Sequence, residues 1–421
     1  MAQRSVSVLF TGQLREKAMF ERSLEELSAL SCVKEFILST WHSEALANAD
    51  YLQGLQARFG LRVVTATDPA LPFDRFNGFR QSVSIRHGLK AVSKAQYVFK
   101  TRTDCHIDAA ALAYLAAKDH RIDNPATAHM RIFREKVSVT CASPLVPFYI
   151  DDKLLFGHRD DLMKLCSTDF LDLKHPSSAK FGHYIRFYPA FMAQFPMFRE
   201  FIRREILITA SNVRFRELFL PSMLQHREYG IMLLAYYRIL SEFFCLDWNG
   251  HAPFFRGEQA RYIDGSGELA IDPDQFCSSN AFFREAADGR VESAALGQLL
   301  AAAAGEVRWL ADMRDIGCGI DWQAFWQARL VQAKGVLQYD KHVEEARRLM
   351  RAGEMSSAFN ILNMLLPCDP GDTQLLFLMG ACYDAVGDRA NAIAMLRDCL
   401  ELGDRFDSLA GQLLRQIEAR T

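Results

Sequence analysis

The sequence lacks the features that mark several large classes of protein. It has no run of 18 or more apolar residues, so it contains no candidate for a membrane-spanning helix. Its basic and acidic side chains nearly cancel, 49 against 51, which argues against a general binder of nucleic-acid backbones. Its ten cysteines include no C-x-x-C pair, which favours reduced, mostly buried thiols. We see no secretory signal peptide and therefore expect a cytoplasmic protein.

Apolar sequence, in contrast, is plentiful. Half of the 421 residues are hydrophobic, which is enough for the cores of two or three domains. We expect an α/β domain over residues 1–255, a connecting and mostly helical region over 256–335, and a helical repeat domain over 336–421.

The first hundred residues alternate between two patterns. Short β-branched or aromatic runs end at turn residues, and between them apolar residues recur at helical spacing. The patterns predict strands at 6–10, 35–40, 61–66 and 96–100, and helices at 16–30, 43–59 and 77–94. Ser43 is expected to cap the second helix and Gly60 to close it. This alternation predicts a Rossmann-like, mostly parallel sheet flanked by helices, with ligands beyond the carboxyl ends of its strands.

The C-terminal region contains an internal repeat. Three residues recur 34 positions further along: Gly353, Ala358 and Leu362 correspond to Gly387, Ala392 and Leu396. A period of 34 with two helices per unit resembles the tetratricopeptide repeat (TPR). Only about two units are visible, so we expect them to pack on the preceding helices. Such units bind a protein partner or a second copy of the chain.

The segment 97–108 holds the strongest candidate for a ligand site. A buried strand leads into Arg102, Asp104 and Asp108 at the edge of the sheet where ligands bind. An acidic residue at this edge can hold a divalent cation, and the cation can neutralise a diphosphate leaving group. We expect this role for Asp104, with a purely structural Arg102–Asp104 pair as the alternative. Asp108 is expected to cap the following helix instead.

Residues after the other strands extend this candidate site. Gly12 and Arg15 follow the first strand, where glycine allows close approach of the backbone to a nucleotide. Thr40 and Trp41 end the second strand, and the Trp41 ring would either stack on a base or sugar or belong to the core. Asp68 follows the third strand, where it would either form a turn or meet the base or ribose.

Four segments in this order resemble the WavE lipopolysaccharide-synthesis family: residues 38–41, 77–84, 88–90 and 99–104. The resemblance covers roughly residues 5–165 and implies a glycosyltransferase of the GT-A kind with a nucleotide-sugar donor. GT-A enzymes usually carry an Asp-x-Asp motif that binds the ribose and a metal. The matching triplet here runs from Arg102 to Asp104, so arginine replaces the first acid. Beside the diphosphate, the Arg102 guanidinium would supply part of the positive charge that a metal otherwise supplies. Mn²⁺ or Mg²⁺ is the metal expected at Asp104.

The resemblance also assigns the helix that begins at Asn77 to the donor site. Arg80 and Ser84 share one face of this helix, because they are four residues apart. Arg80 and Gln81 are expected to contact the base or phosphates of the donor, and a solvated helix face is the alternative. Asn77 and Ser84 complete the expected donor-binding set.

A pair of carboxylates, Asp151 and Asp152, forms the second candidate. They end an apolar run, and the resemblance puts them near the acceptor side of the cleft, where a carboxylate would deprotonate a sugar hydroxyl. Adjacent residues of an extended strand point in opposite directions, so only one of them should act as the base. We favour Asp152 over Asp151, and a surface turn is the alternative.

These observations favour a glycosyltransferase that moves a sugar from a nucleotide-sugar donor to a glycan or glycolipid acceptor of a surface polysaccharide or lipopolysaccharide. Its place would be the cytoplasm or the periphery of the inner membrane. Two alternatives remain. One is a TPR-type interaction protein whose nucleotide-binding domain is inactive, and the other is a sugar nucleotidyltransferase. The second of these usually has a glycine-rich, basic loop near the N-terminus, whereas residues 11–15 contain a single glycine.

Overall fold

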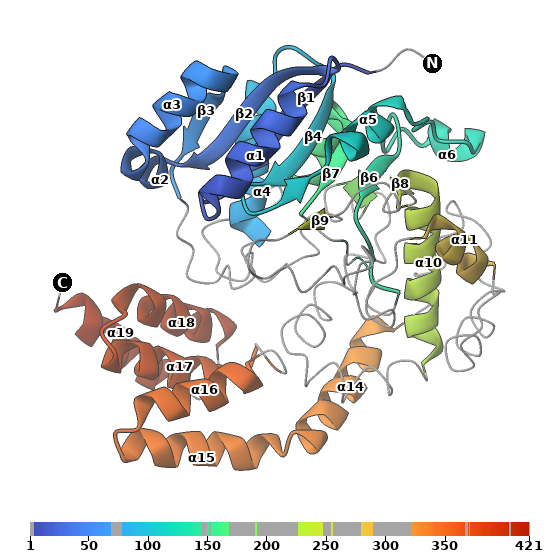
Figure 1. The fold of residues 1–421 in the computed structure, drawn as a ribbon. Coiled ribbons are helices and arrows are strands. Elements are labelled where there is room, and N and C mark those ends of the chain that lie inside the picture. Colours follow the sequence, from blue (N-terminus) through green and yellow to red (C-terminus); the bar gives the residue numbers. More distant parts are fainter. Residues whose placement is uncertain are drawn as a thin grey trace.

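The computed structural model shows an α/β region followed by a stack of helices (Figure 1). It describes residues 4–68, 78–144, 148, 150, 153–167, 190–191, 226–246, 254–255, 279–288, 321–366, 369, 371–403 and 406–420. Among these residues no helix is long and apolar enough to cross a membrane.

The described strands form one large sheet and one small sheet. The large sheet contains β1 (Val6–Thr11), β2 (Val33–Trp41), β3 (Arg62–Ala66), β4 (Tyr97–Arg102), β6 (Val137–Val139), β7 (Leu155–His158) and β8 (Phe244–Cys245). Its order is β3-β2-β1-β4-β7-β6-β8, with the first four strands parallel and β7 antiparallel to β4. The small sheet pairs β5 (His106–Ile107) with β9 (Phe254–Phe255). The prediction of a mostly parallel sheet is confirmed.

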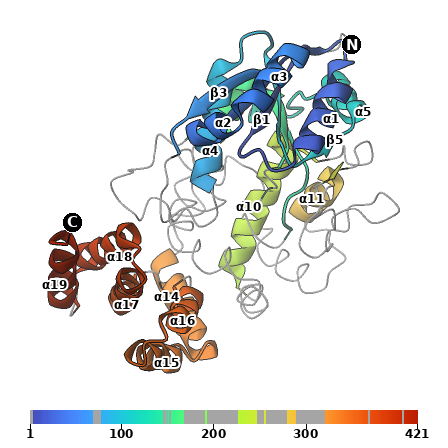
Figure 2. The same ribbon diagram turned by 60° about the vertical axis from the view of Figure 1, so that its left-hand side comes forward.

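Helices cover both faces of the large sheet (Figures 1 and 2). One face carries α1 (Lys17–Ser28), α3 (Ala49–Phe59) and α5 (Ala109–Ala117), and the other carries α4 (Gly78–Ala91) and α7 (Arg159–Leu165). The sequence of β1 explains the two faces, because side chains alternate along a strand. Val8 and Phe10 pack with the first group of helices, whereas Leu9 packs with α4.

The segment 43–59 forms two helices, where the sequence predicts one. α2 (His42–Ala47) and α3 meet at Asn48, whose side-chain amide donates a hydrogen bond to the Glu44 carbonyl over 2.9 Å. Such local bonds compete with helical backbone pairing, and Asn48 leaves the helical conformation at φ −122°. The prediction of Ser43 as the cap is also wrong, because α2 begins one residue earlier. Gly60 closes α3 with φ +64°, as predicted.

α4 lies unusually close to the sheet. A Cβ atom at Gly88 would lie 2.3 Å from Leu9 Cδ1 and 3.1 Å from Ser39 Cβ, so only glycine fits at this point. One turn earlier, the Ser39 hydroxyl donates to the Ser84 carbonyl over 2.7 Å and the Ser84 hydroxyl donates to the Ser39 carbonyl over 3.1 Å. These two hydrogen bonds between β2 and α4 set the distance of α4 from the carboxyl end of β2.

Replacing Gly88 by alanine should therefore lower the free energy of unfolding by about 1–3 kcal/mol, because the added methyl group pushes Leu9 out of its packing. Urea unfolding followed by circular dichroism measures the change. The matched control is Gly54→Ala on α3, where a Cβ would meet nothing within 4 Å. That variant should be neutral or more stable by up to about 1 kcal/mol, since alanine is the better helix former. Equal losses in both variants would contradict the close contact.

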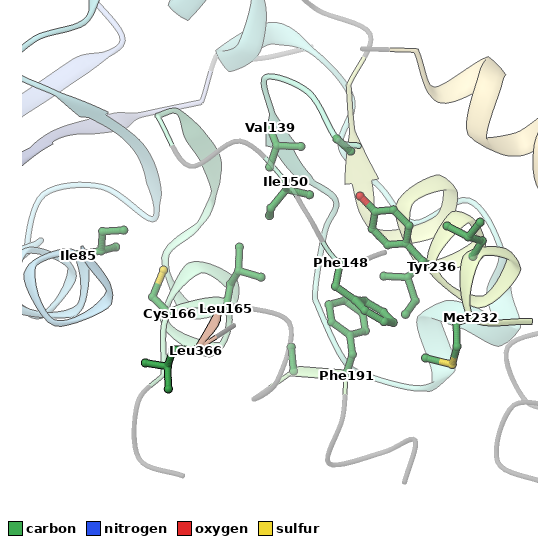
Figure 3. Packing of buried hydrophobic residues seen from close by; sticks show 14 of the residues in the cluster. Ile85, Val139, Phe148, Ile150, Leu165, Cys166, Phe191, Met232, Tyr236 and Leu366 are labelled. Atoms are coloured by element: carbon green, nitrogen blue, oxygen red, sulfur yellow. The ribbon is translucent and has the colours of Figure 1, made fainter. Parts of the chain in front are cut away.

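A largely buried helix supports the other end of the sheet. Thirteen of the 17 residues of α10 (Arg227–Phe243) are buried, and the four that are not are the charged residues Arg227, Glu228, Arg238 and Glu242. Figure 3 shows Tyr236 and Met232 of this helix beside Phe148 and Phe191, and the Phe148 and Tyr236 rings lie 5.4 Å apart. α11 (Asn280–Ala287) packs on α10, and α6 (Pro125–His129) precedes β6.

The C-terminal helices repeat with the predicted period. α14 (Trp322–Val336) leads into α15 (Tyr339–Arg351), α16 (Met355–Leu365), α17 (Thr373–Ala385), α18 (Arg389–Leu402) and α19 (Asp407–Glu418). The start and end of α17 lie 34 residues after those of α15, and Gly353 and Gly387 turn the chain between paired helices at φ +79° and +81°. Gly380 lets α18 approach α17, since a Cβ there would lie 2.8 Å from Leu396. The helical repeat is present; the TPR name and the domain limits at residues 255 and 335 stay predictions.

Candidate functional site

The order of the strands creates a natural place for a ligand. From β1 the chain passes over one face to β2, and it reaches β4 only after α4 has crossed the other face. The connection that follows β1 and the connection that precedes β4 therefore lie on opposite faces of the sheet. Such a switch point leaves a crevice outside the carboxyl ends of the strands, and ligands of open α/β sheets bind there.

A cavity of about 200 Å³ lies at this point. The described residues that line it are Thr11, Gly12, Gln13, Arg15, Trp41, Arg80, Gln81, Ser84, Lys100, Arg102 and Asp104. Pockets for whole drug-sized ligands measure roughly 300–1,000 Å³, so this volume suits part of a nucleotide.

Eight of the residues expected at the site meet in this cavity: Gly12, Arg15, Trp41, Arg80, Gln81, Ser84, Arg102 and Asp104. They come from the ends of β1, β2 and β4 and from the first half of α4. The structure thus brings together segments that are up to about 90 residues apart in the chain. Asn77, Asp151 and Asp152 lie outside the described residues.

Two expected residues do not line the cavity. Thr40 is buried, but it lies between Ser39 and Trp41, which face α4, and strand alternation turns its side chain to the opposite face. Asp68 is not among the described lining residues and forms an ion pair with the lining residue Arg80. Asp108 has the role expected of it, because its carboxylate accepts a 2.8 Å hydrogen bond from the Ala110 backbone and caps α5.

Lys100 is the main lining residue that the sequence interpretation missed. It lies on β4 between Val98 and Arg102, and alternation places all three side chains on the α4 side of the sheet. Lys100 is only 1% exposed. A lysine in the middle of a buried strand is unusual, because a buried ammonium group needs compensating partners. A lysine at this position of an otherwise apolar strand is the feature of the sequence that could have identified Lys100 as a site residue.

The loop after β1 is held at the mouth of the cavity by backbone contacts. Gly12 adopts φ +101°, a conformation that favours glycine, and its amide donates to the Ser39 carbonyl over 3.1 Å. Thr103 donates its hydroxyl to the Gln13 carbonyl, which ties this loop to the turn after β4. The Arg15 guanidinium donates to the Gln13 side chain over 3.1 Å and remains 53% exposed. Arg15 is thus within reach of solvent and of the cavity.

Arg102 and Asp104 form a tight pair inside the cavity. Arg102 Nε donates to one carboxylate oxygen over 2.7 Å and Nη2 to the other over 2.5 Å. Their side chains are 19% and 8% exposed, so the pair is largely withdrawn from water. Arg15 Nη1 lies 4.0 Å from the same carboxylate. Two-pronged contacts of this kind fix both partners in one orientation.

Trp41 and Asp68 together hold Arg80. The Arg80 guanidinium lies over the Trp41 ring, 5.4 Å from its centroid, and also pairs with Asp68. A cation above an aromatic face is attracted by the electrons of the ring. Trp41 is 5% exposed, so its observed role is to support Arg80 from the core. Arg80 reaches the cavity with its orientation set from two sides.

The described lining suits an anion better than a cation. It contains four cationic side chains, Arg15, Arg80, Lys100 and Arg102, and one carboxylate, Asp104. A divalent cation such as Mg²⁺ or Mn²⁺ prefers several oxygen ligands, usually including carboxylates. Among the described residues no group of three or more His, Cys, Asp or Glu side chains is placed to hold a metal ion. The metal expected at Asp104 stays a prediction, and the described residues around this carboxylate do not offer the donor set that it prefers.

The fold and the cavity define an α/β protein with a cationic ligand site at the switch point of its sheet. Residues 8–197 match the model of the family described as WavE lipopolysaccharide synthesis. The match contains every described residue of the cavity and indicates a role in lipopolysaccharide synthesis, whereas α14 to α19 lie outside it. No curated protein and no solved structure matches the chain.

Proposed function

We propose that the protein is a glycosyltransferase that moves a sugar from a nucleotide-sugar donor to a surface-polysaccharide or lipopolysaccharide acceptor. The observation that carries this proposal is the cationic cavity between β1, β4 and α4, inside the segment that matches the WavE family. A nucleotide sugar is joined through a diphosphate, and helix α4 with the β1 loop offers it cationic and amide groups. The GT-A type is the form of this fold that the proposal implies.

The proposed reaction exchanges one bond for another. The bond between the anomeric carbon and the donor phosphate oxygen breaks, and its electron pair stays on the departing nucleoside diphosphate. The acceptor hydroxyl oxygen bonds to the same carbon, and its proton passes to a carboxylate base. Cationic side chains at the cavity stabilise the charge that develops on the diphosphate. The base stays a prediction, with Asp152 favoured over Asp151.

Nucleotide binding tests the proposal directly. In a thermal-shift series with the diphosphates of uridine, guanosine, cytidine and thymidine, each with and without Mn²⁺, at least one should stabilise the full chain. The gain at about 100 times the dissociation constant is about 2.7 kcal/mol. Arg80→Gln should remove most of this gain, because it takes a positive charge from the cavity wall.

The control for that variant is Arg58→Gln. Arg58 is 53% exposed on α3 and pairs with Glu21 and Glu25, away from the cavity, so its loss should leave the nucleotide-induced shift unchanged. If no diphosphate raises the melting temperature under either condition, the chain is not a nucleotide-sugar transferase.

The C-terminal helices favour a second, separate role. The repeat carries a cavity of about 610 Å³, apart from the cavity at the sheet. The described residues that line it are Lys334, Tyr339, Asp340, Val343, Glu344, Arg347, Asp372, Gln374 and Phe406. We propose that this surface binds a protein partner or a second copy of the chain. An interaction protein with an inactive nucleotide site would show this binding and no response to nucleotides.

A further inference from the structure

The state of Asp104 decides how the cavity can hold a diphosphate. Both oxygens of Asp104 accept hydrogen bonds from Arg102, at 2.7 and 2.5 Å, which engages one lone pair on each oxygen. The side chain is 8% exposed, and Arg15 Nη1 lies 4.0 Å from it. A metal at Asp104 would have to share the carboxylate with the Arg102 guanidinium and sit among positive charges.

The described charged side chains around the cavity have an excess of positive charge. Four cationic side chains line its described wall, against the carboxylate of Asp104 in the wall and that of Asp68, which pairs with Arg80. The described groups therefore carry two more positive than negative charges. A diphosphate brings two or three negative charges, so its charge is complementary to that of the described lining.

Lys100 contributes one of these positive charges from a buried position on β4. Lys100 lines the cavity from the middle of β4, on the same face as Arg102, and it is 1% exposed. In such a dry position a charge interacts more strongly with a phosphate than it would in water. Arg15, 53% exposed on the β1 loop, faces the same space from the solvent side.

We infer that the cavity binds the diphosphate of its ligand directly through Lys100, Arg15 and Arg102, with no divalent cation between protein and phosphate. Asp104 is a positioning residue in this arrangement, because it acts through Arg102 and holds the guanidinium at the cavity wall. The inference rests on the proposed function only in that the ligand contains a diphosphate.

Calorimetric titration of the full chain tests the inference. The diphosphate that gives the thermal shift, and its parent nucleoside, are titrated once in EDTA and once in Mn²⁺. The dissociation constant of the diphosphate should agree within about threefold between the two buffers, a difference of under about 1 kcal/mol. Binding that requires Mn²⁺, or that is at least about tenfold tighter with it, overturns the inference and leaves the proposed function standing. Absence of binding in both buffers overturns both.

Substitutions separate the two kinds of site. Lys100→Met and Arg15→Gln should each weaken diphosphate binding in EDTA by about 10–100-fold and change nucleoside binding little, as expected for lost charge-assisted hydrogen bonds. Arg15 is exposed on a loop, so its variant tests the inference even if Lys100→Met does not fold. The control is Arg22→Gln on α1, 69% exposed and paired with Glu26, which should bind as the unmodified chain does.

Asp104→Asn gives opposite results for the two arrangements. If Asp104 is a metal ligand, the amide should weaken diphosphate binding in Mn²⁺ at least about tenfold. If Asp104 positions Arg102, the amide oxygen of asparagine still accepts from the guanidinium while the negative charge is lost, so diphosphate binding in EDTA should be unchanged or tighter. The first result contradicts the inference, and the second supports it.

Discussion

Replacing Arg102 by leucine should lower the free energy of unfolding by about 3 kcal/mol, because it leaves the Asp104 carboxylate buried without its main partner. Because the contact is two-pronged and Asp104 is 8% exposed, we expect the loss of stability to approach that for a buried ion pair. Arg102 is itself 19% exposed, which keeps the expected loss at the lower end of the values for fully buried pairs. Urea unfolding of the variant and the unmodified chain measures the difference.

The chain contains a close match for this pair at its surface. Arg121 bonds to Asp119 with the same separation of two residues, but its Nε and Nη2 atoms both contact one carboxylate oxygen, at 2.8 and 2.7 Å, and its side chain is 75% exposed. Arg121→Leu should therefore cost less than about 1 kcal/mol. The double variant Arg102→Leu, Asp104→Leu should recover much of the lost stability, because no buried charge is left. A loss for Arg102→Leu as small as that for Arg121→Leu would show that Asp104 is hydrated in solution.

Acidification from pH 6.5 to 4.5 should remove about 2–3 kcal/mol of stability through His120 alone. Burial lowers the pKa of His120 to about 4, from an ordinary value of 6.5. One ring nitrogen lies 2.9 Å from the Lys118 carbonyl and the other 3.0 Å from the Ser138 hydroxyl, which suits the neutral ring. The unfolded chain therefore takes up a proton first, so stability is complete above pH 6.5 and is lost as the pH falls toward 4.

The variant His120→Gln isolates this effect. Glutamine keeps a donor and an acceptor but does not titrate, so the melting temperature of the variant should change less between pH 6.5 and 4.5. Glu35 does not obscure the window. Burial opposes its ionisation, but hydrogen bonds from Ser7 and from the backbone of Lys94 and Ser93 hold its pKa below the ordinary value of 4.5. Its contribution is lost at lower pH. Identical pH profiles for variant and unmodified chain would mean that His120 is accessible to protons.

The parallel half of the sheet was predictable because each strand is rich in apolar or β-branched residues and is followed by a turn or a helix signal. The Asn48 break was not, because it depends on a side chain that bonds to its own helix. The short strands β6 and β8 were also missed. They contain three and two residues and exist only because β7 and β6 lie beside them.

The candidate site was predictable for the residues that follow a strand, since parallel strands present their carboxyl ends at one edge. The same rule, applied without strand alternation, added Thr40, which is not among the described lining residues, and passed over Lys100, which is. The contact between Arg102 and Asp104 could be named from the sequence only as an alternative. Its geometry depends on the turn at Thr103, which brings two residues of opposite charge to the same side of the chain.

The place of β1 in the sheet has a consequence for synthesis of the protein. β1 is the first of the described strands in the chain, yet one of its neighbours is β4, which is complete only at residue 102, and the sheet gains its last described strand at residues 244–245. On the ribosome, one edge of β1 must therefore wait unpaired while about 90 further residues emerge. Unpaired apolar edges invite association between nascent chains. Chaperone demand during translation should accordingly be highest before β4 has formed.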